Sequence, residues 1–223
     1  MVDWLVDLYD AFVGRFILVV HPSFESEVRE HCQHRPRISY ARQESPTGML
    51  DAILAPLTDA RRDNPDRVWI TWCDQIAIHP TTVERLNDLS EQHRTASLIF
   101  PTATRRAPYI DIVRNEEGRI VDIRHQREGD EMPEIGESDM GLFSLSPDAY
   151  LHRLVEFARR VEPATTTRER NFLPFIPWLS QQGGDVRTFP CRDEQEAIGI
   201  NTPDDLRIIE RYLATRNGPG WAR

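Results

Sequence analysis

Strand-length apolar runs and helix-period segments alternate along the first half of the chain. Runs of β-branched and aromatic residues, bounded by turn residues, predict buried strands, whereas apolar positions spaced three or four apart predict helices. On this basis strands are expected at 16–20, 38–42, 68–72 and 96–100, and helices at 4–12, 23–32, 48–60 and 81–92. Strands and helices in this order are typical of a parallel sheet covered on both faces.

The pattern changes after Pro101. Two alternating segments, 109–114 and 119–123, are joined by a turn containing Gly118, which predicts an antiparallel hairpin. Residues 127–138 are polar and acidic and are expected to form a loop. The remaining segments predict strands at 141–145 and 186–189 and helices at 147–161, 171–182 and 204–214.

These elements predict a single α/β domain over residues 1–216, followed by a frayed tail over 217–223. The expected fold is Rossmann-like, with a mixed, mostly parallel sheet and helices on both faces. The apolar content is 39%, and no stretch approaches the ~20 apolar residues of a membrane helix. We expect a cytoplasmic protein without a membrane partner, because no signal-peptide pattern follows Met1.

The charge balance makes nucleic acid an unexpected partner. The net charge is −9, and the basic residues are scattered rather than gathered into a stripe that would neutralise phosphates. All of these basic residues are arginine, so the chain has no lysine amine for catalysis or phosphate contact. The cysteines, Cys32, Cys73 and Cys191, are odd in number and far apart, which favours reduced thiols.

Candidate chemistry lies at the carboxyl ends of the predicted strands, where open α/β sheets bind ligands. The segment 42–52 joins a strand to a helix; Gln43 offers an amide for a base edge, and Gly48 permits a close backbone approach. A plain strand-to-helix connection, with Thr47 as the helix cap, explains the same residues. Asp74 ends an apolar strand and suits Mg²⁺, or caps a turn. Asn201 precedes a helix and is either a cap or a ligand.

Two further clusters have ordinary explanations. His31, Cys32 and His34 offer metal-ligating atoms, but their spacing lacks the second pair of a zinc site, which favours a solvated helix end. The run 124–127, which includes Arg127, offers cations for a phosphate but is also typical of a solvated strand edge.

In their order along the chain, four segments resemble motifs of the sugar-phosphate nucleotidyltransferases, the family of glucose-1-phosphate thymidylyltransferase and N-acetylglucosamine-1-phosphate uridylyltransferase. The resemblance runs through nearly the whole chain and implies the fold of nucleotide-diphospho-sugar transferases. The matching segments are Gln43-x-Ser45-Pro46-x-Gly48, the strand end at Asp74, Glu137-x-Asp139-x-Gly141, and Glu196-x-x-Gly199-x-Asn201.

The resemblance implies transfer of a nucleoside monophosphate from a nucleoside triphosphate to a phosphorylated acceptor, with release of pyrophosphate. Asp74 and Asn201 would be the catalytic residues and would hold Mg²⁺. The implied nucleotide-binding residues are Gln43, Pro46, Thr47, Gly48 and Cys73. The implied acceptor-binding residues are Tyr109, Arg127, Glu137, Asp139 and Gly141.

Three departures from the family pattern change what we expect. Cys73 stands where the family usually has glycine, and Asp139 where it usually has asparagine, so the acceptor is expected to carry a cationic or hydroxyl-rich group. The family's first strand and glycine-rich phosphate loop have no counterpart in the sequence, so the domain is expected to be truncated at its first strand and to have little activity alone. Alternatives are a non-catalytic nucleotide-sugar-binding or regulatory subunit and a metal-dependent glycosyltransferase. A homo-oligomer is compatible with all three.

Overall fold

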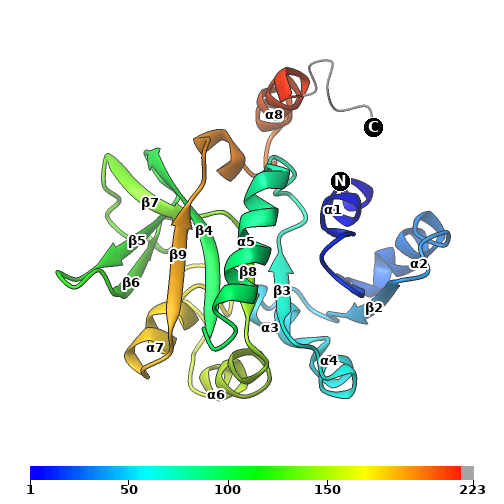
Figure 1. Ribbon diagram of the computed structural model, residues 1–223, viewed down its shortest axis with the longest axis horizontal. Helices are drawn as coiled ribbons and strands as arrows, with labels where there is room; N and C mark the ends of the chain where they lie inside the picture. The colour runs from blue at the N-terminus through cyan, green and yellow to red at the C-terminus, as the bar shows by residue number, and fades with distance from the viewer. Residues whose placement is uncertain (217–223) are drawn as a thin grey trace.

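The computed structural model describes residues 1–216, in which helices pack against a twisted mixed sheet (Figure 1). The predicted tail at 217–223 lies outside the described residues. The first half contains α1 (Val2–Tyr9), β1 (Phe16–Val20), α2 (Pro22–His31), β2 (Ile38–Arg42), α3 (Met49–Leu54), α4 (Leu57–Asp63), β3 (Val68–Thr71) and α5 (Pro80–Gln92).

Local signals explain where several of these helices begin and end. Both α2 and α5 start with a proline in the first turn, and the ring nitrogens of His21 and His79 accept hydrogen bonds from the backbone N–H groups two residues on. The prediction of one continuous helix at 48–60 is wrong. The segment divides into α3 and α4 at Pro56, which lacks the N–H that a continuous helix would need there.

The second half alternates strands with short helical turns. One expectation here is wrong, because the last residues of the polar segment 127–138 form a strand that pairs with β4. The elements are β4 (Leu98–Arg106), β5 (Ile110–Arg114), β6 (Ile120–His125), the 3-10 turn Gln126–Glu128, β7 (Ile135–Asp139), β8 (Leu142–Leu145), the π-helical turn Ala149–Arg153, α6 (Leu154–Ala158), α7 (Phe175–Gln181), β9 (Val186–Pro190), the 3-10 turn Glu194–Ala197, and α8 (Pro203–Arg216).

The central sheet has five strands and is organised around the long strand β4. Its order is β3-β8-β4-β7, and β9 also pairs with β4. The β4–β9 pair is parallel, whereas β8 and β7 run antiparallel to their neighbours. The predicted mixed α/β class is therefore confirmed, with more antiparallel pairing than the sequence led us to expect. The predicted hairpin is also confirmed as the β5–β6 pair.

Side chains alternate between the two faces of this sheet, as strand geometry requires. In β4, Phe100 lies in a core cluster with residues of α3, α6 and α7, while Ile99 lies in a second cluster with residues of α1 and α5. In β8, Phe143 and Leu142 divide in the same way. Figure 1 shows α5 crossing one face of the sheet. Helices therefore cover both faces, as predicted.

Two parallel strands near the N-terminus stand apart from the central sheet. β1 pairs with β2, and β3 pairs with β8, but within residues 1–216 no strand is bonded to the second edge of β1 or of β3. Phe16 in β1 and Trp69 in β3 nevertheless pack against the same core cluster. None of the described helices has the length and apolar character needed to cross a membrane.

Candidate active site

Three segments that are distant in the sequence meet at the end of β3. The backbone N–H of Trp72 donates to the carbonyl of Gly141 over 3.0 Å, which extends the contact with β8 beyond the strand. The N–H of Ile200 donates to the carbonyl of Asp74 over 3.1 Å. These two bonds bring the segment after β3, the turn before β8 and the segment before α8 into one site around Asp74.

Two glycines allow this close approach. A Cβ atom on Gly199 would lie only 2.7 Å from Oδ2 of Asp74, so any larger residue would displace that carboxylate. A Cβ atom on Gly141 would lie 2.3 Å from the Trp72 ring, and Gly141 has a φ of +63°. That backbone conformation favours glycine. The glycines of two predicted motifs are thus needed for contacts around Asp74.

Asp139 is the second carboxylate of this site. Its Oδ1 accepts a hydrogen bond from the N–H of Gly141 over 2.8 Å. Burial raises the pKa of Asp139 to about 6, and the negative charge of Asp74 acts in the same direction. Burial also raises the pKa of Asp74 above its usual value. Two desolvated carboxylates favour a cation or a hydrogen-bond donor between them.

Glu137, two residues before Asp139 in β7, is held by an arginine that the sequence did not indicate. Arg114 donates from Nε and from one terminal nitrogen to the two carboxylate oxygens, both over 2.7 Å, and also donates to Oγ1 of Thr188. Burial opposes ionisation of Glu137, but the hydrogen bonds from Arg114 and Thr102 outweigh it and lower the pKa. Glu137 is therefore an ionised acceptor fixed in one orientation.

Glu196 fixes the segment that reaches Asp74. It is 1% exposed, and its Oε2 accepts bonds from the N–H of His79 and the hydroxyl of Thr82 at the start of α5. Its side chain also completes a capping box with Asp193. The family-like glutamate therefore has a structural role, which is to attach the segment containing Gly199 to α5.

Asn201 is exposed and directly follows the residue that bonds to Asp74. Thr202 caps α8, because its hydroxyl accepts from the N–H of Asp205 over 3.2 Å. The backbone N–H of Asn201 donates to the Asp205 carboxylate, and its side chain makes no hydrogen bond within the described part of the chain. The amide of Asn201 is therefore available to a ligand.

The Gln43–Gly48 loop is closed upon itself and packed against a distant segment. The Gln43 amide donates to the carbonyl of Gly48 over 3.0 Å. Gly48 has a φ of +122°, and a Cβ atom there would lie 2.5 Å from the backbone nitrogen of Arg170. The close packing against Arg170 by itself explains why glycine is needed at position 48. Pro46 and Thr47 are exposed on the loop.

The other predicted contact residues have their own surroundings. Cys73 is exposed directly beside Asp74. Tyr109 is 43% exposed, and its ring meets the His125 ring edge-on with centroids 5.0 Å apart. Arg127 lies 3.7 Å from Glu169. Neighbours around the β5–β6 hairpin and the segment before α7 thus position Tyr109 and Arg127, rather than the residues around Asp74.

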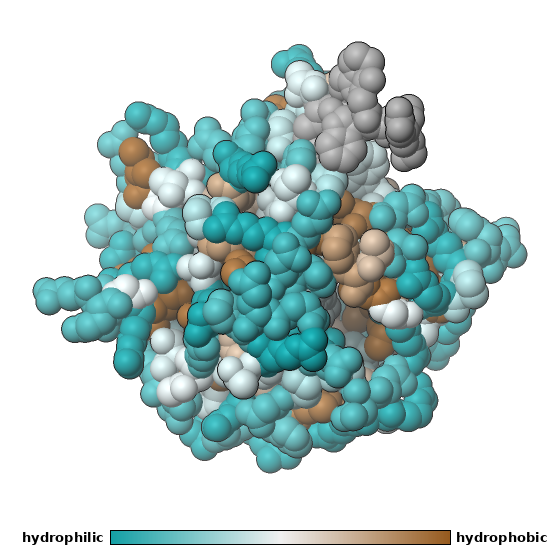
Figure 2. Space-filling model, viewed as in Figure 1, coloured by the Kyte–Doolittle hydropathy of each residue, from teal (hydrophilic) through white to brown (hydrophobic). Residues whose placement is uncertain are grey.

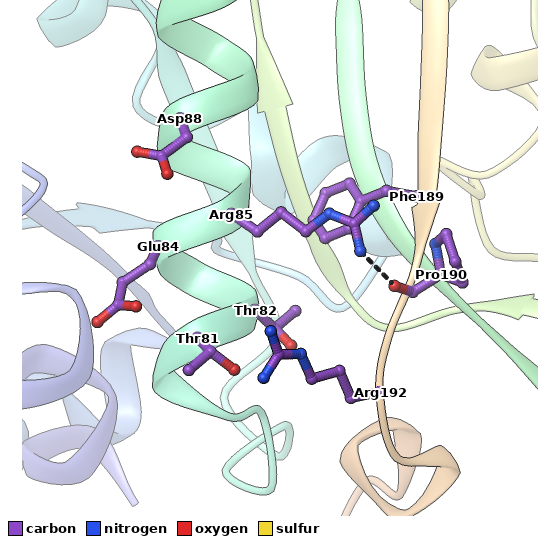
Figure 3. A pocket seen from close by; sticks show the side chains of 8 residues that line it. All are labelled: Thr81, Thr82, Glu84, Arg85, Asp88, Phe189, Pro190 and Arg192. Carbon is purple, nitrogen blue, oxygen red and sulfur yellow. Dashed lines mark hydrogen bonds between the residues drawn. The ribbon is translucent and has the colours of Figure 1, made fainter.

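A separate hollow of about 250 Å³ lies between α5 and the end of β9 (Figure 3). Arg85 crosses it, lies over the Phe189 ring and donates to the carbonyl of Pro190 over 3.3 Å. The face that carries α5 is mostly hydrophilic (Figure 2). The hollow contains none of the predicted site residues. It is lined by Thr81, Thr82, Glu84, Arg85, Asp88, Phe189, Pro190 and Arg192.

Comparison with known sequences assigns the chain to a family. Residues 1–182 match the MobA-like NTP transferase domain. The chain belongs to this family. The resemblance to sugar-phosphate nucleotidyltransferases drawn from the sequence motifs is thereby confirmed at the level of the NTP transferase domain.

Curated relatives of this NTP transferase domain include two proteins named bifunctional protein GlmU. The protein from Thermodesulfovibrio yellowstonii is 24% identical over 99% of this chain and 47% of its own length. The protein from Caldicellulosiruptor saccharolyticus is 24% identical over 91% of this chain and 43% of its own length. The chain therefore spans less than half the length of these relatives.

A solved structure supports the predicted fold. The NTP transferase domain is similar to CMP:2-keto-3-deoxy-manno-octonic acid synthetase complexed with CTP, with a TM-score of 0.63. The alignment covers 96% of this chain and 87% of the synthetase, at 14% identity. At this identity the likeness establishes the nucleotide-diphospho-sugar transferase fold.

Sequence reasoning missed two residues that adjoin the predicted ones. Arg114 lies in a predicted hairpin strand, and its pairing with Glu137 depends on how the hairpin lies against β7. Gln75 directly follows Asp74, yet a single glutamine carries no spacing signal. The polarity of Gln75 immediately after an apolar strand end was the one available sign.

Proposed function

We propose that this NTP transferase domain is an Mg²⁺-dependent nucleotidyltransferase. It transfers a nucleoside monophosphate from a nucleoside triphosphate to a sugar phosphate or a similar phosphorylated acceptor. The observation that carries the proposal is the convergence on Asp74 of the segments containing Asp139 and Gly199, held by the bond from Ile200. Family membership and the CTP complex of the structural neighbour agree with it.

In this reaction the protein mainly positions the two substrates and forms no covalent bond with them. An oxygen of the acceptor phosphate attacks the α-phosphorus, a new P–O bond forms, and the bond to the β-phosphate breaks so that pyrophosphate leaves. In-line arrangement of these atoms and neutralisation of their charge supply most of the rate. The side chains around Asp74 therefore act by holding both substrates in place.

The oxygen donors of the site fit a magnesium ion. Asp74 and Asp139 are desolvated carboxylates with raised pKa values, and Asn201 is an exposed residue that directly follows the one whose N–H bonds to the Asp74 carbonyl. Hard oxygen ligands of this kind suit Mg²⁺. In the proposal Asp74 and Asn201 hold the ion, which when bound would offset charge on the phosphates.

The two substrates would occupy opposite sides of this centre. On the nucleotide side, the loop with Gln43, Pro46, Thr47 and Gly48 orients the base, with Cys73 beside it. On the acceptor side, Glu137 and Asp139 accept hydrogen bonds from hydroxyl groups near Gly141. Tyr109 and Arg127 contact the outer part of the acceptor.

We further propose that full turnover requires a phosphate-binding loop in addition to the described residues. Three arginines of the described part have partners within the chain: Arg105 donates to the carbonyl of Ala197, Arg106 pairs with Glu134, and Arg127 pairs with Glu169. The second edges of β1 and β3 are also without a strand in the described part. A strand and loop inserted there would bring backbone N–H groups to the triphosphate.

The test is pyrophosphate release with Mg²⁺, a panel of nucleoside triphosphates and several sugar phosphates. The 223-residue chain is compared with a chimera that adds the first strand and glycine-rich loop of a GlmU relative. We expect turnover by the chimera and little by the chain alone. Robust turnover by the chain alone would refute the loop requirement, and nucleotide binding without turnover by either protein would favour a non-catalytic nucleotide-sugar-binding subunit.

A further inference from the structure

The side-chain oxygen of Gln75 is buried without a hydrogen-bond partner among residues 1–216. Gln75 is 9% exposed, and its Oε1 is inaccessible and unbonded within this part of the chain. Its backbone N–H donates to the carbonyl of Trp72, so the turn that carries it is secured independently of the side chain. An unsatisfied buried amide is destabilising, and natural proteins rarely retain one without a use.

One other buried side-chain atom of residues 1–216, Nε2 of the partly exposed His125, also lacks a hydrogen-bond partner. The other fully buried polar side chains of these residues have partners. Ser90 bonds with Ser144, Ser138 with the carbonyl of Ile110, and Thr82 with Glu196. The rest of the set also have hydrogen-bond or ion-pair partners. These are Glu25, Thr102, Asp111, Ser144, Ser146 and Glu196.

Gln75 lies between two backbone segments of the candidate site. A Cβ atom on Gly141 would be 2.8 Å from its Cγ, and one on Gly199 would be 2.9 Å from its Nε2. The side chain thus fills the space between the acceptor-side turn and the segment leading to Asn201, directly beside Asp74. Because Oε1 is inaccessible as it lies, a ligand reaches it only when the amide rotates about its last torsion, which brings the oxygen to the place where Nε2 now faces Gly199.

We infer that Gln75 is a specificity-determining residue whose amide oxygen accepts a hydrogen bond from a hydroxyl group of the phosphorylated acceptor. The inference rests on the proposed function and extends it. The Asp74 carboxylate and the Gln75 amide both lie against Gly199, and Asp139 bonds to Gly141, which also adjoins Gln75. Acceptor oxygens are thus gathered here, so the matching ligand group is a hydrogen-bond donor. A site with a buried acceptor discriminates against a ligand that lacks the hydroxyl, because the amide oxygen then stays unpaired.

The first measurement compares wild type with Gln75→Leu and with Ser90→Ala as a matched control, without ligand. Leucine fills a similar volume and removes the unpaired amide, so Tm should rise by about 2–4 °C. Ser90→Ala removes a partner from a satisfied pair and should lower Tm. A Tm for Gln75→Leu equal to or below that of wild type would show that the amide is satisfied, and would overturn the inference.

The second measurement is the affinity for glucose 1-phosphate and its 2-, 3-, 4- and 6-deoxy analogues, by calorimetric titration with and without UTP or CTP. One deoxy analogue should bind wild type about 3- to 10-fold more weakly than the parent. Gln75→Leu should bind the parent more weakly by the same factor and lose that discrimination, with nucleotide affinity unchanged.

The outcomes separate this inference from the proposed function. Binding of nucleotide and acceptor with equal hydroxyl discrimination in wild type and Gln75→Leu would overturn the role of Gln75 and leave the nucleotidyltransferase proposal intact. Absence of any nucleotide or acceptor binding by wild type, under conditions in which the chimera also fails, would overturn both.

Discussion

The backbone N–H of Ile200 donates a hydrogen bond to the carbonyl oxygen of Asp74 over 3.1 Å, and this bond joins the two segments that carry the proposed metal ligands. Asn201 is exposed and directly follows Ile200, so this bond holds the backbone that carries Asn201 against the Asp74 segment. Glu196 holds the segment that leads to Ile200 in place by accepting hydrogen bonds from the start of α5. Two motifs far apart in sequence thus become one site through main-chain geometry.

Replacing Asp74 with asparagine should abolish magnesium binding while leaving the fold intact. Removing a partly desolvated charge does not weaken packing, so the free energy of unfolding should stay the same or increase slightly. Turnover of the active chimera should fall about 100-fold or more, because charge on the phosphates is no longer offset. Titration calorimetry with Mg²⁺ checks binding, and the exposed Asp88→Asn serves as control. Unchanged Mg²⁺ affinity in Asp74→Asn would contradict the assignment.

Replacing Gly199 with alanine should damage the site more than the fold. The new Cβ would lie 2.7 Å from Oδ2 of Asp74 and would displace that carboxylate. We expect a stability loss of about 1 kcal/mol but at least a tenfold loss of turnover, as expected for a shifted ligand. The control is Gly14→Ala, since nothing lies within 4 Å of that position. Chemical denaturation and steady-state kinetics are the measurements, and equal turnover in the two variants would refute the contact.

Glu137 and Arg114 should behave as one energetic unit. Each single replacement, Glu137→Gln or Arg114→Met, breaks a two-point ion pair whose side chains are 25% and 30% exposed. Each should cost about 1–2 kcal/mol of unfolding free energy, and the double variant should cost less than their sum. Urea denaturation of the four proteins gives the coupling energy. A coupling near zero would mean that the pair contributes only orientation.

The stability of the metal-free protein should depend on pH through Asp139. Its pKa rises from 3.8 to about 6 on folding, so the folded state binds the proton more tightly than the unfolded state. The stabilisation is full below pH 4 and is lost as the pH rises to 6, by up to about 3 kcal/mol. Asp139→Asn should remove this loss and raise Tm at pH 7, whereas the exposed Glu84→Gln should not. Parallel pH profiles for wild type and Asp139→Asn would contradict the burial of this carboxyl.

Much of the fold could be predicted because local patterns report local structure. The apolar runs at 16–20 and 68–72 and the helix-period segments at 23–32 and 81–92 predicted element positions close to those observed. Other elements could not be found in this way. The strand at 135–139 is polar in composition and exists because β4 offers it a partner edge. Pro56 separates α3 from α4, although the apolar positions on either side of it follow one helical pattern.

The sequence by itself determined the family, because the motifs that contain Gln43, Asp74, Asp139 and Asn201 occur along the chain in the order typical of NTP transferases. Only the tertiary structure decided which side chains of these segments come into contact with one another. Three features depend on distances between segments that are far apart in the chain. They are the Arg114–Glu137 pair, the unpaired side-chain oxygen of Gln75 and the raised pKa of Asp139. Such distances are set by packing and burial, which no local pattern encodes.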